Sequence, residues 1–108
     1  MSELVQVATP EEILPGDSKT IVHDDQPIAI FNVDGVYFAI GNLCPHAAGP
    51  LVQGFIEQGR IVCPWHGWSF TLSPDDPPND GLPRYRVVVE RDKICIEFPA
   101  IEVDKSWR

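Results

Sequence analysis

Residues 28–40 contain two apolar, β-branched runs joined by Asp34-Gly35, a pattern that leaves few alternatives to a β-hairpin. Asp-Gly connections favour tight hairpin turns because both central residues of such a turn need positive φ. In the whole chain Ile and Val together outnumber Leu by 21 to 6, and β-branched residues pack well on pleated strands. The sequence therefore predicts a mostly β domain built around this hairpin.

Further strands are expected on both sides of the hairpin. Alternation predicts a strand over Glu3–Ala8, and Thr9-Pro10-Glu11-Glu12 is a capping box that predicts one helical turn, ended by Pro15-Gly16. A short hairpin is expected around Gln58-Gly59. The other expected strands cover residues 19–23, 68–72, 85–90 and 94–98. Residues 100–108 are expected to form a loosely held terminus.

Length and composition are those of one domain. The 108 residues include 32 Leu, Ile, Val and Phe residues, which is enough for a hydrophobic core. The composition changes over residues 41–83, which hold seven of the eleven prolines and two of the three tryptophans. We expect a single domain over residues 1–108 with a loop-built insert at about 41–83.

Charge and hydropathy exclude several classes of function. The formal net charge is −8, and residues 1–59 contain eight acidic side chains and one basic side chain, so a nucleic-acid partner is not expected. No apolar run approaches the roughly 20 residues of a membrane-spanning helix. The N-terminal residues lack the basic leader and apolar stretch of a signal peptide. We expect a cytoplasmic protein that does not bind membranes.

Two short motifs bring together two thiols and two imidazoles. They are Cys44-Pro45-His46 and Cys63-Pro64-Trp65-His66. Four soft or borderline ligands in two pairs are typical of a metal site. A structural zinc site uses the same residue types, but its usual spacings pair Cys with Cys and His with His. The mixed pairs favour a binuclear centre, and a zinc-stabilised binding module is the alternative.

The pattern C-x-H followed by C-x-x-H resembles the Rieske family of [2Fe-2S] proteins. The resemblance includes Gly49-Pro50-Leu51 after the first motif and Gly67-Trp68 after the second, and it covers about residues 3–98. It implies an all-β fold in which an antiparallel β-sandwich base carries an inserted, loop-rich cluster-binding subdomain. It also implies one [2Fe-2S] cluster, with Cys44 and Cys63 binding one iron and with His46 and His66 binding the other at an exposed tip.

Three positions depart from the high-potential Rieske proteins of cytochrome bc complexes, which the chain otherwise resembles. Those proteins carry a disulfide between two additional cysteines at the positions of Gly49 and Trp65. A serine that donates a hydrogen bond to cluster sulfur corresponds to Trp68. Fewer donors to the sulfur atoms stabilise the added electron less, so the reduction potential falls. We expect a low-potential ferredoxin.

The resemblance implies a soluble one-electron carrier that is a monomer when free. Its expected partners are a flavin-dependent reductase and a terminal oxygenase of the aromatic-ring dioxygenase type. The alternative is the Rieske small subunit of an NAD(P)H-dependent nitrite reductase, whose partner is the large subunit. The sequence contains no phosphate-binding loop and no nucleophile–base pair, so an enzymatic activity of the chain alone is not expected.

The remaining candidate residues have structural interpretations. Cys95 lies between two isoleucines and is expected to be a buried, inert thiol, and His23 beside two aspartates is expected to be exposed. The aromatic residues of the insert are expected to serve mainly in packing: Trp65, Trp68 and Phe70. The acidic side chains of the Pro-rich loop are expected to be solvated, or to attract a basic reductase: Asp75, Asp76 and Asp80.

Overall fold

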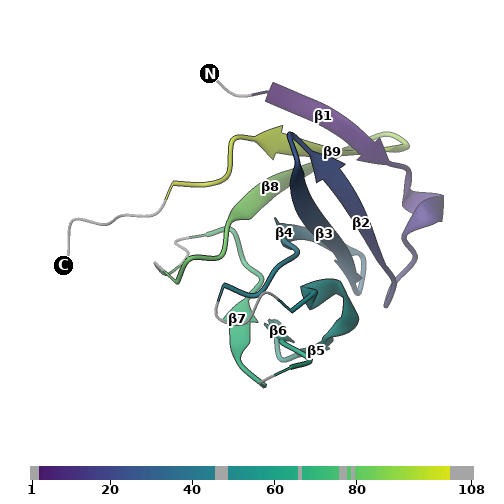
Figure 1. The fold of residues 1–108 in the computed structure, drawn as a ribbon. Coiled ribbons are helices and arrows are strands. Elements are labelled where there is room, and N and C mark those ends of the chain that lie inside the picture. The colour runs from purple at the N-terminus through teal and green to yellow at the C-terminus, as the bar shows by residue number, and fades with distance from the viewer. Residues whose placement is uncertain (1–2, 46–48, 66, 76–77, 79, 103–108) are drawn as a thin grey trace.

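The protein is described from a computed structural model covering residues 3–45, 49–65, 67–75, 78 and 80–102. Its base is a six-stranded antiparallel sheet in the order β1-β9-β8-β4-β3-β2 (Figure 1). The strands are β1 (Glu3–Ala8), β2 (Ser18–His23), β3 (Gln26–Val33), β4 (Val36–Gly41), β8 (Arg84–Glu90) and β9 (Lys93–Phe98). The expected all-β fold and the expected antiparallel base are confirmed.

The sheet consists of two three-stranded halves joined by only two residue pairs between β4 and β8. Buried side chains from both halves form one core, so the halves pack face to face as a sandwich. This core comprises Ala8, Ile13, Ile28, Ile30, Ala39, Tyr85, Ile94, Ile96 and Phe98. The half-buried rim of the same core includes Val5, Ile21 and Val87.

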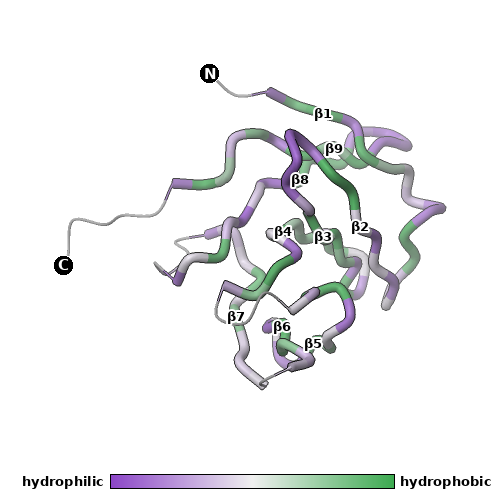
Figure 2. The backbone as a smooth tube through the Cα atoms, in the orientation of Figure 1, coloured by the Kyte–Doolittle hydropathy of each residue, from purple (hydrophilic) through white to green (hydrophobic). Residues whose placement is uncertain are grey.

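Strand β3 supplies side chains to two cores, one on each face. Ile28 and Ile30 belong to the sandwich core, whereas Ala29 and Phe31 face a second core under the insert. Strand residues alternate between faces, so a strand buried on both sides needs a continuous apolar run. Figure 2 shows the apolar part of β3 in the middle of the molecule. The run that predicts the hairpin therefore also joins the base to the insert.

The predicted turns are confirmed at both hairpins. Asp34 and Gly35 have φ of 53° and 91°, and Gln58 and Gly59 have φ of 52° and 77°. Positive φ at both central residues is the requirement of the tight turn that matches strand twist. Near the N-terminus, η1 (Pro10–Glu12) is a single 3-10 turn, and the Glu12 carboxylate accepts the Thr9 N–H at 2.7 Å.

The insert is built from short elements. It contains η2 (Leu51–Gln53) and a three-stranded antiparallel sheet in the order β5-β6-β7 (Figure 1). The strands are β5 (Phe55–Glu57), β6 (Arg60–Val62) and β7 (Ser69–Thr71). Strand β7 is two residues shorter than the strand predicted over 68–72. The expectation for the C-terminus falls largely on residues 103–108, which lie outside the described part. None of the described helices is long and apolar enough to cross a bilayer.

Candidate metal centre

Cys44 and Cys63 lie together in the second core, between the base and the insert. Their exposed fractions are 2% and 1%, and they share this core with Leu51, Ile61 and Leu82. Neither forms a disulfide, and nor does Cys95, so none of the three cysteines, all of them described, is oxidised to a bridge. Two reduced thiols buried at the start of neighbouring loops are suited to bind a soft metal.

The first ligand loop begins after β4 and is closed by Asn42. The Asn42 N–H donates to the Pro27 carbonyl at 2.9 Å, and the Asn42 carbonyl accepts the Leu51 N–H at 2.6 Å. Its side-chain oxygen accepts the Val52 N–H at 2.8 Å. Asn42 is 8% exposed, so these bonds satisfy its backbone groups and its side-chain oxygen in a buried position. Our sequence reasoning missed this residue, because an Asn after a strand is also ordinary turn chemistry.

The second ligand loop is a turn between β6 and β7. The Cys63 N–H donates to the Trp68 carbonyl at 2.7 Å, and the Gly67 N–H donates to the Cys63 carbonyl at 3.1 Å. Gly67 has φ of 73°, a left-handed conformation that glycine adopts without steric cost. The first loop has a corresponding closure, in which the Cys44 N–H donates to the Gly49 carbonyl at 2.8 Å. Backbone bonds thus fix both cysteines.

The two loops meet at Gly49. A Cβ atom at this position would lie 3.0 Å from Cδ2 of Trp65 and 3.4 Å from Sγ of Cys63. The positions that the sequence comparison assigns to the inter-loop disulfide of bc-type proteins, Gly49 and Trp65, therefore lie against each other. Here packing of an indole ring on a glycine joins the loops.

The other two predicted ligands, His46 and His66, lie outside the described residues. No group of three or more His, Cys, Asp or Glu side chains suited to a metal gathers among the residues that the structure does describe. The structure therefore tests only the two cysteine ligands of the predicted cluster, Cys44 and Cys63. Two buried, reduced thiols in facing loops, with a glycine at the closest approach, fit an iron–sulfur cluster.

Two of the three aromatic residues expected in packing are exposed. Phe70 is 5% exposed and lies in the second core as expected, but Trp65 and Trp68 are 59% and 51% exposed. Neither tryptophan is buried in the core, although the Trp65 indole packs on Gly49. Trp68 and Pro45 line a surface pocket of about 520 Å³ together with Arg60, whose Nε donates to Ser69 Oγ at 3.0 Å.

The acidic loop was also predicted wrongly in one respect. Asp75 is exposed as expected, and Asp76 lies outside the described residues, but Asp80 pairs with the buried Arg84 at 2.9 Å. Burial raises the pKa of Asp80, whereas hydrogen bonds from Arg84 and from the Leu82 N–H lower it. The lowering outweighs the burial, and the pKa of Asp80 lies below its usual value.

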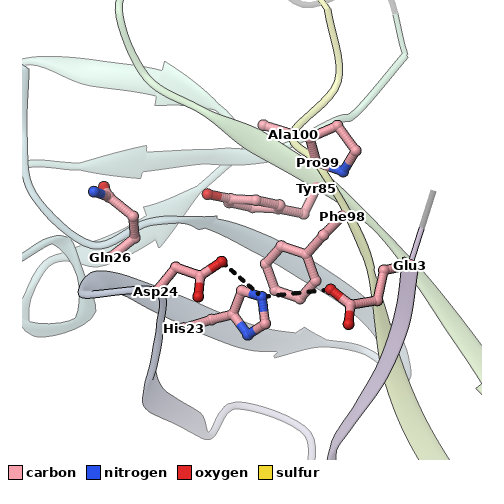
Figure 3. A pocket seen from close by; sticks show the side chains of 8 residues that line it. All are labelled: Glu3, His23, Asp24, Gln26, Tyr85, Phe98, Pro99 and Ala100. Atoms are coloured by element: carbon pink, nitrogen blue, oxygen red, sulfur yellow. Dashed lines mark ion pairs between the residues drawn. The ribbon is translucent and has the colours of Figure 1, made fainter. Parts of the chain in front are cut away.

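His23 was expected to be exposed, and the structure corrects this. Its ring stacks on Phe98 with the ring centroids 3.9 Å apart. Its Nε2 lies 3.5 Å from the Asp24 carboxylate and 3.7 Å from that of Glu3 (Figure 3). The pocket beside it, of about 300 Å³, is lined by base residues and contains no cysteine. Cys95 is buried in β9, as expected.

Comparisons with known proteins point to an iron–sulfur domain. The family model of the Rieske [2Fe-2S] domain matches residues 3–85. The biphenyl dioxygenase ferredoxin subunit of Pseudomonas sp. (strain KKS102) is 32% identical over 93 residues, covering 82% of this chain and 85% of that protein. Mouse apoptosis-inducing factor 3 is 40% identical over 67 residues, but this match spans 58% of the chain and only 11% of that relative.

Solved structures show the same fold. The ferredoxin of carbazole 1,9a-dioxygenase from Nocardioides aromaticivorans IC177 has a TM-score of 0.76 and 27% identity, covering 86% of this chain and 95% of that one. A protein described as an NADH-dependent nitrite reductase small subunit from Mycobacterium tuberculosis has a TM-score of 0.78 and 20% identity, covering 94% and 99%. The second likeness concerns the fold alone.

Proposed function

The chain belongs to the Rieske [2Fe-2S] family, and from this membership we propose that it is a one-electron carrier between a reductase and a terminal oxygenase of the aromatic-ring dioxygenase type. The observation that carries the proposal is the pair of buried, reduced thiols in facing loops. A bound [2Fe-2S] cluster supplies one-electron transfer at potentials of about −150 to +300 mV. The described part of the chain shows no other constellation suited to redox chemistry.

We propose Cys44 and Cys63 as the ligands of one iron and His46 and His66 as the ligands of the other. The chain's own part is to hold these side chains in place. Asn42 closes the first loop, Gly67 lets the second loop turn, and the second core keeps water from the thiols. Groups around the ligands fix the orientation of the ligand side chains and control solvent access, and both affect the reduction potential of a metal site.

The partners of the proposed carrier are a flavin-dependent reductase and the oxygenase. The ferredoxin relatives support the oxygenase, and the net charge of −8 supports a basic docking face on the reductase, since opposite charges raise association rates. Electron-transfer contacts are usually small, below about 1,200 Å². We further propose that residues 1–108 act as one domain, monomeric when free and cytoplasmic.

Reconstitution tests this function. The purified chain is combined with a flavin reductase and a dioxygenase oxygenase component, and NADH-driven product formation is measured with and without the chain. We expect turnover only when the chain is present. Reduction of the chain by the reductase without any transfer to an oxygenase would contradict the oxygenase part of the proposal.

A second candidate is that the chain is the small subunit of a nitrite reductase, since its sequence motifs resemble those of such subunits and it shares their fold. The two candidates differ in how tightly the partner binds. A subunit comigrates with its large subunit on a sizing column, whereas a shuttle with a small contact surface separates from its partner during the run.

The position of Trp68 allows a test of the low reduction potential. Trp68→Ser places a hydroxyl where the high-potential relatives donate a hydrogen bond to sulfur. We expect the potential to rise by about 60 mV, which is a tenfold change in the equilibrium of a one-electron couple. Protein-film voltammetry measures the shift.

Trp68→Ala is the matched control, because it removes the same exposed indole without adding a hydroxyl. We expect this variant to keep the wild-type potential. Equal shifts in the two variants would show that loss of an indole, and not the added hydroxyl, changes the potential.

A further inference from the structure

The segment between β7 and β8 is held by a buried guanidinium group. The Arg84 side chain has no exposed surface, although it remains charged in proteins. Its Nε donates to the Thr71 carbonyl at 2.8 Å, and its Nη1 donates to the Leu82 carbonyl at 3.0 Å. Arg84 thus joins the end of β7 to the last part of the Pro-rich loop.

Asp80 supplies the opposite charge in a two-point contact. Its Oδ1 accepts from Nη1 at 2.9 Å, and its Oδ2 accepts from Nη2 at 3.0 Å. Oδ1 also accepts the Leu82 N–H at 3.1 Å, so one carboxylate orders both the guanidinium and the turn that follows it. Bidentate arginine–carboxylate pairs are among the stronger hydrogen-bonded contacts, and a buried arginine left without its partner is costly.

The segment that this pair holds lies against the first ligand loop. A Cβ atom at Gly81 would lie 3.3 Å from Cβ of Pro45, the residue after Cys44. The Pro83 carbonyl accepts the N–H of Gly41, the last residue of β4 before that loop, at 2.9 Å. The same arginine bonds the strand that follows the second ligand loop, so the pair touches the supports of both loops.

We propose that Asp80 and Arg84 are positioning residues of the metal centre, which hold residues 80–83 on the first ligand loop and limit how often solvent enters behind it. The inference rests on the proposed function, since the proposed cluster is the group that the segment would shield. Neither residue contacts a predicted ligand directly. Their effect passes through Pro45 and through the backbone of β7.

The chain contains a matched control pair. Asp75 and Arg86 come from the same loop and the same strand, and they form an ion pair at 3.4 Å. Their side chains are 80% and 51% exposed, and exposed pairs contribute little because water screens them. Removal of either carboxylate takes one negative charge from the chain. Only the removal of the Asp80 carboxylate leaves a buried arginine without its ion-pair partner.

The experiment compares Asp80→Asn with Asp75→Asn in the iron-containing protein. One readout is the rate at which an added iron chelator bleaches the visible absorbance. The other is hydrogen exchange, measured by mass spectrometry, in peptides covering residues 41–45 and 80–84. We expect Asp80→Asn to accelerate both by at least about tenfold, and Asp75→Asn to change neither by more than about twofold. Equal behaviour of the two variants would overturn the proposal.

A second variant separates positioning from general stability, and it also serves if Asp80→Asn does not fold. Asp80→Asn/Arg84→Met removes the unpaired charge, so the thermal unfolding midpoint recovers. In this double variant the Thr71 and Leu82 carbonyls lose the donors that Arg84 supplies, so we expect exchange in residues 80–84 and bleaching to remain fast. Recovery of all three readouts together would show a purely structural role. If the wild-type protein carries no iron, the proposed function fails, while the exchange comparison still tests the pair.

Discussion

Cys63→Ser is expected to yield a protein without an iron–sulfur cluster and therefore without visible colour. The thiolate is the form that binds soft metals, and a serine hydroxyl neither ionises at neutral pH nor matches the softness of sulfur. We expect nearly complete loss of bound iron and inorganic sulfide. Chemical iron and sulfide determination, with the visible absorbance spectrum beside it, measures the loss.

Cys95→Ser is the matched control for this substitution. Cys95 is also buried and reduced, but it lies in β9 of the base, away from the ligand loops. We expect it to keep the full iron content, with at most a modest loss of stability. Full iron content in Cys63→Ser, or a colourless Cys95→Ser protein, would refute the proposed ligand set.

Gly54→Ala is expected to disrupt the insert. Gly54 follows η2, and a methyl group there would overlap the carbonyl oxygen of Val62 at the end of the β5–β6 pair. That carbonyl belongs to the backbone next to Cys63, so relief of the overlap must move the second ligand loop. We expect a loss of about 3 kcal/mol in the free energy of unfolding, at the upper end of overpacking effects. Urea unfolding measures it.

Gly59→Ala separates this clash from the ordinary cost of replacing a glycine. Gly59 lies in the turn between β5 and β6 with φ of 77°, and a Cβ atom there meets nothing within 4 Å. We expect this variant to lose about 1 kcal/mol in the free energy of unfolding, because alanine must adopt a left-handed conformation there. If the two alanine variants lose the same stability, the close approach at Gly54 does not constrain the loop.

The parts of the fold that could be predicted rest on local chemistry. Asp34-Gly35 and Gln58-Gly59 determine their turns through residues that tolerate positive φ, and both hairpins form there. The alternation in Glu3–Ala8 and the apolar run of β3 likewise depend on adjacent residues. Such patterns predict where a strand forms and how it pairs, because the turn type and the alternation of side chains between faces depend on residues adjacent in the sequence.

The failures involve contacts between distant segments. His23 stacks on Phe98 because β1 and β9 close the sandwich beside β2, and nothing near residue 23 in the sequence indicates this. Asp80 is held by a guanidinium group that becomes buried only once β8 pairs with β4 at Ile40. In the candidate site, the cysteines could be predicted from their spacing, whereas Asn42 depended on how the loop returns to β3.

A redox titration of the purified protein, by voltammetry with an absorbance spectrum beside it, tests the central claim most directly. We expect a coloured protein with one reversible one-electron wave near the lower end of the Rieske range, about −150 mV. A colourless protein without a wave would contradict the claim and favour a zinc-stabilised binding module. A wave near +300 mV would retain the cluster but contradict the low potential inferred from Gly49, Trp65 and Trp68.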